Sequence, residues 1–387
     1  MDTPIYLDYA ATTPMAPEVV EAMLPCLTDA GVFANPSSNQ HSFGADAASA
    51  MEKARSQIAA VFQGGSKDFI FTSGATEANN LAIKGTALTR QNARRHIITS
   101  AIEHKSVLAT CKHLETQGIG VTYIRPDSKG MLAVDEVLNV VTDETILVSI
   151  MHVNNETGVI QPVAEIARVL EDKDLLFHVD AAQSAGKMAI DLNLTPIDLL
   201  SLSAHKFHGP KGVGCLYIRN RSKNRLTPLL HGGGQEFGLR PGTSPTHQIV
   251  GMASALQLAQ QNMTRDAEHC QRLKRSLLDV LMPLGGITLN GEQSETLPNI
   301  VNLGFDQVSA DSLLITLRDN VAIASGSACN SGAVEASHVL RAMGIEGDRL
   351  YGAVRISFGR YTTETEIRTA GHRIAEQVLR LRELASA

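Results

Sequence analysis

From about residue 44 onward, stretches with helical spacing of apolar residues alternate with short apolar runs that are typical of strands. Residues 146–153, ILVSIMHV, form a nearly continuous apolar run, as expected of a strand covered on both faces of a parallel sheet. The alternation predicts an α/β fold with a mainly parallel sheet flanked by helices. The predicted strands are 68–72, 96–100, 121–126, 146–153, 175–180 and 197–204, and the predicted helices are 44–63, 75–88, 103–117, 134–141 and 161–174.

The pattern changes near residue 262. A long helix over 266–284 is followed by short strands at 299–305, 321–325 and 353–359 and by a helix over 363–385. We therefore predict a large domain over 16–262 and a smaller α+β domain made of 1–15 together with 263–387, with YLDYAATTP as an extended arm. The smaller domain would carry a mobile loop at about 324–334, because the small residues of ASGSACNSG have little to pack.

Composition and charge narrow the class of protein. The 387 residues are 43% hydrophobic, which suits about two globular domains, and the net charge of -6 argues against a dedicated nucleic-acid binder. The basic run RNRSKNR (Arg219, Arg221, Lys223, Arg225) is interpreted as a solvated loop, with an acidic partner or a nucleic acid as the alternative. The N-terminal sequence lacks a signal-peptide pattern, and no apolar stretch approaches a membrane span, so we expect a soluble cytoplasmic protein.

The five cysteines are odd in number and form no CxxC pair, so neither a disulfide framework nor a zinc site is expected. Cys26, Cys111, Cys215 and Cys270 lie in helical or strand patterns and are predicted to be small buried hydrophobes. Cys329 differs, because it lies among glycine, serine and alanine in the predicted mobile loop.

Five predicted strands end in polar or ionisable side chains. They are followed by Ser73-Gly74-Ala75-Thr76, Glu103-His104, Asn154-Asn155-Glu156, Asp180 with Gln183, and His205-Lys206. Ligands of open α/β sheets bind at the carboxyl ends of the strands, so these groups should converge on one crevice. One such residue is usually a cap, and a lone lysine is usually a solvated turn residue. Five such ends together favour a ligand site.

The residue types indicate the ligand. The start of a helix after Gly74 suits a phosphate, although a Ser or Thr there is usually only a cap. A desolvated Lys206 suits an aldehyde, and Asp180 suits a protonated ring nitrogen. These three chemical features together describe pyridoxal 5'-phosphate (PLP). A metal site from His205 and His208 is not expected, because no ligand cluster supports it, and His208 is interpreted as structural.

The motifs YLDYAATTP, NPSS, TSGATEANNLAIKG, EHKSVL, HVNNETG, HVDAAQSAGK, SAHKFHGPKG, HGGGQEFGLRPGT and ASGSACNSG follow one another in this order. From about Tyr6 to Arg360 the chain resembles the group I cysteine desulfurases of the NifS/IscS family. These are fold-type I PLP enzymes of the class V aminotransferase superfamily, so the resemblance implies that fold.

The resemblance also implies site residues. Lys206 would form the Schiff base with PLP, His104 would stack on the pyridine ring and shuttle protons, and Asp180 would bind the ring nitrogen. Further cofactor contacts would come from Gln183 at the phenolic oxygen and from Ala75, Thr76, Ser203 and His205 at the phosphate. Thr243 would reach the phosphate of a second subunit, which implies a homodimer. Asn155 and Arg355 would bind the substrate carboxylate.

Cys329 distinguishes the reaction from that of other PLP enzymes. The resemblance implies that it takes sulfur from L-cysteine as a persulfide, leaving L-alanine, and that the loop carries the sulfur to an acceptor protein. A selenocysteine lyase or C–S lyase is the nearest alternative, and a non-catalytic sulfur-carrier protein is another. An aminotransferase would need no such cysteine.

The chain departs from the family pattern at three places. Phe237 stands in GGGQEFGLR where the family has arginine, ASGSAC replaces SSGSAC, and the sequence ends at RELASA, short of an extension that docks iron–sulfur scaffolds. The acceptor therefore stays open among iron–sulfur cluster assembly, tRNA thiolation and DNA phosphorothioation.

Overall fold

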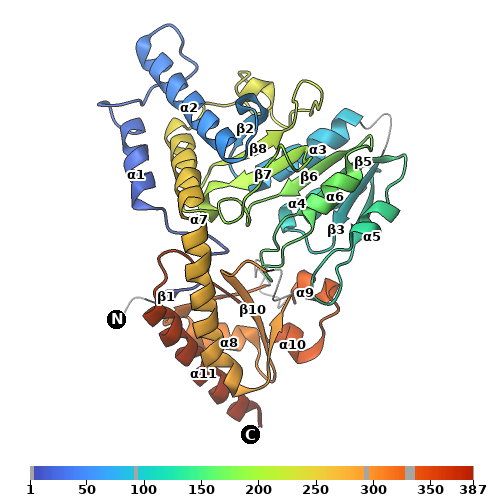
Figure 1. Cartoon of the computed structure of the whole chain (residues 1–387), viewed down its shortest axis with the longest axis vertical. Helices are drawn as coiled ribbons and strands as arrows, with labels where there is room; N and C mark the ends of the chain where they lie inside the picture. The colour runs from blue at the N-terminus through green and yellow to red at the C-terminus, as the bar shows by residue number, and fades with distance from the viewer. Residues whose placement is uncertain (1–3, 91–94, 292–295, 327–335, 387) are drawn as a thin grey trace.

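The computed structural model describes residues 4–90, 95–291, 296–326 and 336–386 (Figure 1). A seven-stranded sheet in the order β2-β8-β7-β6-β5-β3-β4 forms the upper part of the molecule. Strand β8 is antiparallel to both of its neighbours, whereas the pairs from β7 to β4 are parallel. The predicted mainly parallel sheet is confirmed. Its strands are β2 (Phe69–Thr72), β3 (His96–Ser100), β4 (Gly120–Ile124), β5 (Thr145–Met151), β6 (Leu176–Asp180), β7 (Leu199–Ser203) and β8 (Gly214–Ile218).

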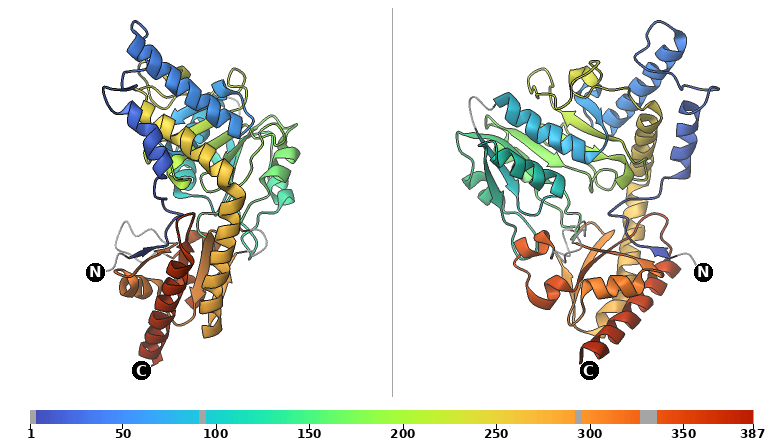
Figure 2. Two further views of the ribbon diagram at one scale, coloured as in Figure 1. Left: turned by 60° about the vertical axis from the view of Figure 1, so that its left-hand side comes forward. Right: turned by 180° about the vertical axis from the view of Figure 1, so that it is seen from behind.

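Helices cover both faces of this sheet (Figure 2). One face packs on α1 (Pro17–Met23), α2 (Ser42–Val61), α5 (Val134–Asn139), α6 (Val163–Leu170) and the first half of α7 (Thr246–Leu281), and the other face packs on α3 (Ala75–Arg90) and α4 (Lys105–Glu115). In β5, Val148 faces the first layer and Leu147 the second. Coverage of both faces explains why this strand is apolar at all positions except Thr145 and Ser149.

Helix α7 is a single helix of 36 residues, so the prediction that a helix begins at 266 was wrong. Its first half buries Ile249 and Leu256 in the core of the large sheet, and its second half buries Leu273 and Leu277 in a separate core. The mostly polar residues 260–266 lie between these two cores. Because they interrupt the apolar spacing, the sequence pattern did not show that the helix is continuous. The domain boundary at residue 262 stays a prediction, and it falls inside α7.

The lower part contains a four-stranded antiparallel sheet in the order β12-β13-β10-β9. The predicted strand 321–325 is divided between two sheets. Its first half, β11 (Val321–Ala322), pairs with the N-terminal arm at β1 (Ile5–Tyr6), and its second half, β12 (Ala324–Ser325), pairs with β13. The other elements are β9 (Ile287–Asn290), β10 (Ile300–Phe305), β13 (Ala353–Ser357), α8 (Ala310–Leu317), α9 (His338–Ala342), α10 (Gly347–Tyr351) and α11 (Glu364–Ser386).

The basic run after β8 is partly built into the fold. Arg219 donates hydrogen bonds to the carbonyl oxygens of Ile197 and Thr195, both at 2.9 Å. The Arg221 guanidinium lies 3.9 Å from the centre of the Phe237 ring. Lys223 and Arg225 are exposed. The solvated-loop interpretation therefore fits Lys223 and Arg225, while Phe237, the departure from the family pattern, gives Arg221 a structural role.

The predictions about the cysteines and about membrane-spanning segments can be compared with the structure. Cys26, Cys111, Cys215 and Cys270 are buried free thiols, as predicted, and burial raises the pKa of Cys111 and of Cys270 to about 12. Cys329 lies outside the described residues. Across the described ranges, no helix has both the length and the apolar character needed to cross a membrane.

Candidate active site

The carboxyl ends of β2, β3, β5, β6 and β7 open onto one cavity of about 910 Å³. The N-terminal arm contributes Ala10, Ala11 and Thr12 to its wall, and the chain entering the Cys329 segment contributes Ala324, Ser325 and Gly326. The cavity thus collects residues from both parts of the molecule. Ten residues with a predicted role line it: Ala75, Thr76, His104, Asn155, Asp180, Gln183, Ser203, His205, Lys206 and Arg355.

Lys206 lies in the short 3₁₀ helix η3 (Ala204–Lys206) that follows β7. Its Nζ donates hydrogen bonds to the carbonyl oxygens of Ala10 at 2.7 Å and of Ala11 at 2.8 Å. Burial, and to a lesser extent Arg355, lowers the pKa of Lys206 to about 8, while Asp180 and Asp8 oppose the shift. An amine with this pKa has a substantial neutral, nucleophilic fraction near pH 8.

Asp180 ends β6 and is 5% exposed. Its Oδ1 accepts a hydrogen bond from the Ala182 N–H at 2.9 Å, and its Oδ2 accepts one from Asn79 Nδ2 at 2.7 Å. These two donors fix the carboxylate at the cavity wall. Asn79, which the sequence did not single out, lies one turn after Thr76 on α3.

The predicted phosphate contacts lie where α3 and η3 begin. Helix α3 starts at Ala75, directly after Gly74, and presents its first N–H groups there. Ser203 is buried beside it at the end of β7. Burial lowers the pKa of His205 to about 4, with Lys206 adding to the shift, so this imidazole is neutral at physiological pH. A neutral imidazole, a hydroxyl and free N–H groups are a donor set that suits a phosphate.

The predicted carboxylate contacts are already engaged. Arg355 donates from Nη2 to Asp8 Oδ1 at 2.8 Å and from Nη1 to the Asn155 carbonyl oxygen at 2.9 Å. A substrate carboxylate at Arg355 therefore has to share the guanidinium with Asp8. The Asn155 contact runs through its backbone, which the sequence could not indicate.

Two buried polar atoms in the cavity wall have no hydrogen-bond partner within the described ranges. They are Gln183 Oε1 and Arg355 Nε. Because buried polar atoms in folded proteins are nearly always paired, these atoms indicate a polar ligand at this wall. The residues present therefore fit a phosphate-bearing, polar aromatic cofactor. No group of three or more His, Cys, Asp or Glu side chains in the described part of the chain is arranged to hold a metal ion.

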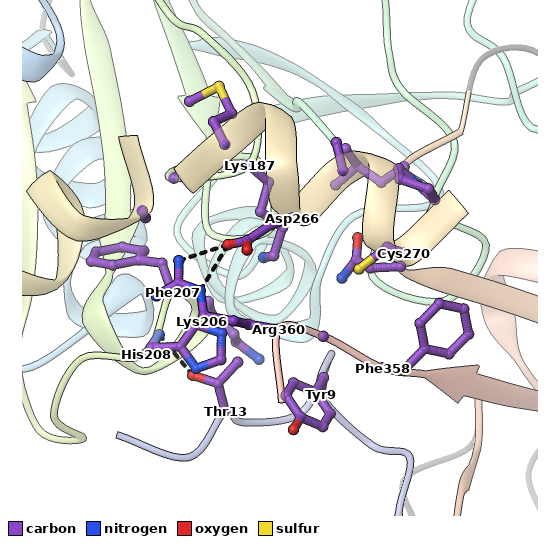
Figure 3. A pocket seen from close by; sticks show the side chains of 18 residues that line it. Tyr9, Thr13, Lys187, Lys206, Phe207, His208, Asp266, Cys270, Phe358 and Arg360 are labelled. Carbon is purple, nitrogen blue, oxygen red and sulfur yellow. Dashed lines mark hydrogen bonds and ion pairs between the residues drawn. The ribbon is translucent and has the colours of Figure 1, made fainter. Parts of the chain in front are cut away.

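A second cavity, of about 60 Å³, lies beside Lys206 (Figure 3). Asp266 of α7 pairs there with Arg360 at 2.6 Å, and His208 Nδ1 donates to the Pro14 carbonyl oxygen at 2.9 Å. The His208 ring packs against Tyr9 and Tyr361. These contacts fasten the N-terminal arm, so the structural interpretation of His208 agrees with its surroundings.

Thr243 and Cys329 are not among the residues placed in the cavity. Thr243 is exposed in the segment before α7 and does not line the cavity of its own chain. Cys329 lies outside the described residues. Both roles stay predictions.

Glu156 has a position that the sequence did not reveal. Its buried carboxylate accepts a hydrogen bond from Ser337 Oγ at 2.5 Å. A Cβ added to Gly326 would collide with Glu156 Oε2 and lie 3.0 Å from Ser337 Cβ. Gly326 and Ser337 flank the segment that contains Cys329, so both ends of this segment rest on one carboxylate. Gly326 is required for close packing, besides any need for flexibility.

Comparison with known proteins gives the family. The sequence matches the Aminotransferase class-V family over residues 5–369. It is 46% identical over 385 residues to the cysteine desulfurase IscS of Vibrio vulnificus (strain YJ016), covering 100% of this chain and 95% of that protein. A solved NifS-like protein has a TM-score of 0.91 at 38% identity, covering 97% of this chain and 99% of that one. SspA in complex with cysteine has a TM-score of 0.82 at 40% identity, covering 92% and 99%.

The fold is therefore that of a class-V aminotransferase. The chain belongs to this family, in its branch of IscS- and NifS-type cysteine desulfurases. The resemblance that the sequence motifs carry is confirmed.

We expect Gly326→Ala to destabilise the protein by about 1–3 kcal/mol, because the added methyl group displaces the Glu156 carboxylate from Ser337. The thermal unfolding midpoint measures this loss. Gly65→Ala is the matched control, because Gly65 is exposed, has φ of -74° and would meet the Asp68 side chain alone. In the double variant Glu156→Ala/Gly326→Ala the two losses should be less than additive. Equal midpoints for Gly326→Ala and Gly65→Ala would contradict this packing role.

Proposed function

We propose that this chain removes sulfur from L-cysteine and produces L-alanine and a persulfide on Cys329. One observation supports this reaction over other chemistry in the same fold. Gly326, just before the segment that carries Cys329, and His338, just after it, both line the cavity. A cysteine in this segment is connected at both ends to the cavity that contains Lys206.

PLP, when bound, supplies an electron sink that allows Cα to lose its proton and Cβ its sulfur. Lys206 would hold it through the amine, and Asp180 would pair with its ring nitrogen. His104 would lie against the ring, and Gln183 would contact the phenolic oxygen. The phosphate would bind at Ala75, Thr76, Ser203 and His205, where the start of α3 meets η3.

Different residues of this chain would bind the substrate and transfer its proton. Arg355 would bind the substrate carboxylate, and Asn155 supports that guanidinium through its carbonyl oxygen. Lys206 would take the Cα proton, because burial has already lowered the pKa of its amine to about 8. Removal of the Cα proton would therefore need no base other than Lys206.

The Cys329 thiolate would attack the substrate sulfur. A sulfur–sulfur bond forms while the Cβ–S bond breaks, and the electron pair of the broken bond stays with the substrate. Proton return to that fragment completes L-alanine. One L-cysteine and one thiol thus give one L-alanine and one persulfide, with no external oxidant or reductant.

We propose that the chain acts as a homodimer and passes its sulfur to an acceptor protein. Thr243 is exposed and does not line its own cavity, which suits a residue that serves the partner's site. The acceptor's pathway stays open among iron–sulfur cluster assembly, tRNA thiolation and DNA phosphorothioation.

Replacing Cys329 tests the reaction. We expect Cys329→Ala to lose protein persulfide completely and to form alanine at least about 100-fold more slowly, because the sulfur has no nucleophile to receive it. Cys26→Ala is the matched control, since Cys26 lies outside the cavity lining. Alanine and persulfide are quantified after incubation with L-cysteine. Equal sulfur release by the wild-type protein and Cys329→Ala would favour a C–S lyase, and preference for selenocysteine would favour a selenocysteine lyase.

The pKa of Lys206 predicts how cofactor capture depends on pH. Burial, then Arg355, lowers this pKa to about 8, so the neutral amine is depleted below that pH and predominates above it. We expect the rate at which the apoprotein captures PLP to rise about tenfold per pH unit below 8 and then level off. A free lysine derivative, with an ordinary pKa of about 10.4, is the control for changes in PLP itself. A protein rate that keeps rising to pH 10 would contradict a buried amine.

A further inference from the structure

His104 caps the N-terminus of α4 with its own side chain. The Ser106 backbone N–H donates to His104 Nδ1 at 3.1 Å, and Ser106 Oγ lies 2.8 Å from the same nitrogen. A backbone N–H can only donate, so Nδ1 must offer its lone pair. The ring proton of neutral His104 therefore belongs on Nε2.

The Ser106 hydroxyl is oriented by a buried amide. Asn79, with no exposed surface, donates from Nδ2 both to Asp180 Oδ2 at 2.7 Å and to Ser106 Oγ at 2.8 Å. The contact with the carboxylate fixes which end of the amide carries the hydrogens, because the carboxylate accepts. Ser106 Oγ thus accepts from Asn79 and has its own hydrogen free to donate to His104 Nδ1. A directed chain of hydrogen bonds runs from Asn79 through Ser106 to His104.

We propose that Asn79 and Ser106 are positioning residues that hold His104 as a neutral imidazole with its proton on Nε2. The tautomer rests on the hydrogen-bond geometry alone, and its consequence for catalysis rests on the proposed function. With Nε2 protonated and Nδ1 occupied by donors, His104 has no free lone pair to accept a proton. It can donate a hydrogen bond into the cavity, and the proton transfers at Cα fall to Lys206. The proposal therefore assigns His104 a different role from the proton shuttling that the family resemblance implies.

The charged neighbours of the ring agree with a neutral state. Desolvation lowers the pKa of His104, with Lys206, His338 and Lys105 lowering it further, and Asp180 opposes them. Asn79 also donates a hydrogen bond to Asp180 Oδ2. One amide therefore connects Asp180, which would pair with the pyridine nitrogen of PLP, with Ser106 and, through it, with His104. A substitution at Asn79 should therefore change the hydrogen bonding of both Asp180 and His104.

The test is ¹⁵N NMR of the holoenzyme with ring-labelled histidine, with the His104 signals assigned by their loss in His104→Gln. At pH 7.5 we expect a protonated Nε2 and an unprotonated Nδ1, and a ring pKa below the ordinary value of 6.5, because burial disfavours the charged imidazolium. Ser106→Ala and Asn79→Ala remove or misorient the hydroxyl donor to Nδ1 and should raise this pKa toward 6.5, while the Ser106 backbone N–H keeps the neutral ring protonated on Nε2. Ser106→Thr, which keeps the hydroxyl, should retain the wild-type spectrum.

Asn80→Ala is the matched control, because Asn80 is adjacent to Asn79 and bonds to the Thr76 carbonyl oxygen instead of the chain to His104. It should leave the His104 signals unchanged. A wild-type His104 that is protonated on Nδ1 at pH 7.5, or signals that do not respond to Ser106→Ala and Asn79→Ala, would overturn the proposal. Because the spectra need no turnover, they separate this proposal from the desulfurase reaction itself.

Discussion

The two hydrogen bonds from Lys206 to the carbonyl oxygens of Ala10 and Ala11 join parts of the chain almost two hundred residues apart. The arm that supplies these carbonyls pairs through β1 with β11, and Asp8 of the same arm holds Arg355. The lysine, the predicted carboxylate-binding arginine and the arm therefore depend on one another. The arm also closes over the amine, and this burial is the main cause of its lowered pKa. The hydrogen bond from His208 to the Pro14 carbonyl oxygen also holds the arm in this position.

A second constraint acts on the other side of the cavity. Glu156, in the turn that follows β5, has a buried carboxylate that packs against Gly326 and accepts a hydrogen bond from Ser337. In the proposed reaction the Cys329 segment would carry sulfur away from the cavity, and its ends need fixed positions if the cysteine is to return to the same substrate atom. Glu156 gives those ends a common support at the cavity wall. The support and the arm together explain why the site needs both parts of the molecule.

The sequence predicted the features that follow from local apolar patterns and from the direction of the chain. The parallel strands appeared as apolar runs, and their carboxyl ends led to Asp180, His104 and Lys206 because strand ends of one direction meet at one edge. Helix α7 was cut short because its polar middle lies between two cores. Strand β8 was not placed in the sheet, since an antiparallel strand breaks the βαβ alternation on which the prediction depended. Asn79, Ser106 and Glu156 act through contacts between distant segments, and no local pattern distinguishes them from ordinary cap or strand-end residues.

The proposed transfer of sulfur to Cys329 would distinguish this chain from other members of its fold, and it can be followed directly. The holoenzyme would be mixed with a substoichiometric amount of L-[³⁴S]cysteine, alkylated, digested and analysed by mass spectrometry. We expect the heavy sulfur as a persulfide on the peptide that contains Cys329, in an amount equal to the alanine formed. Alanine formed with the heavy sulfur entirely in solution, or on any of the buried cysteines instead, would contradict a Cys329 persulfide.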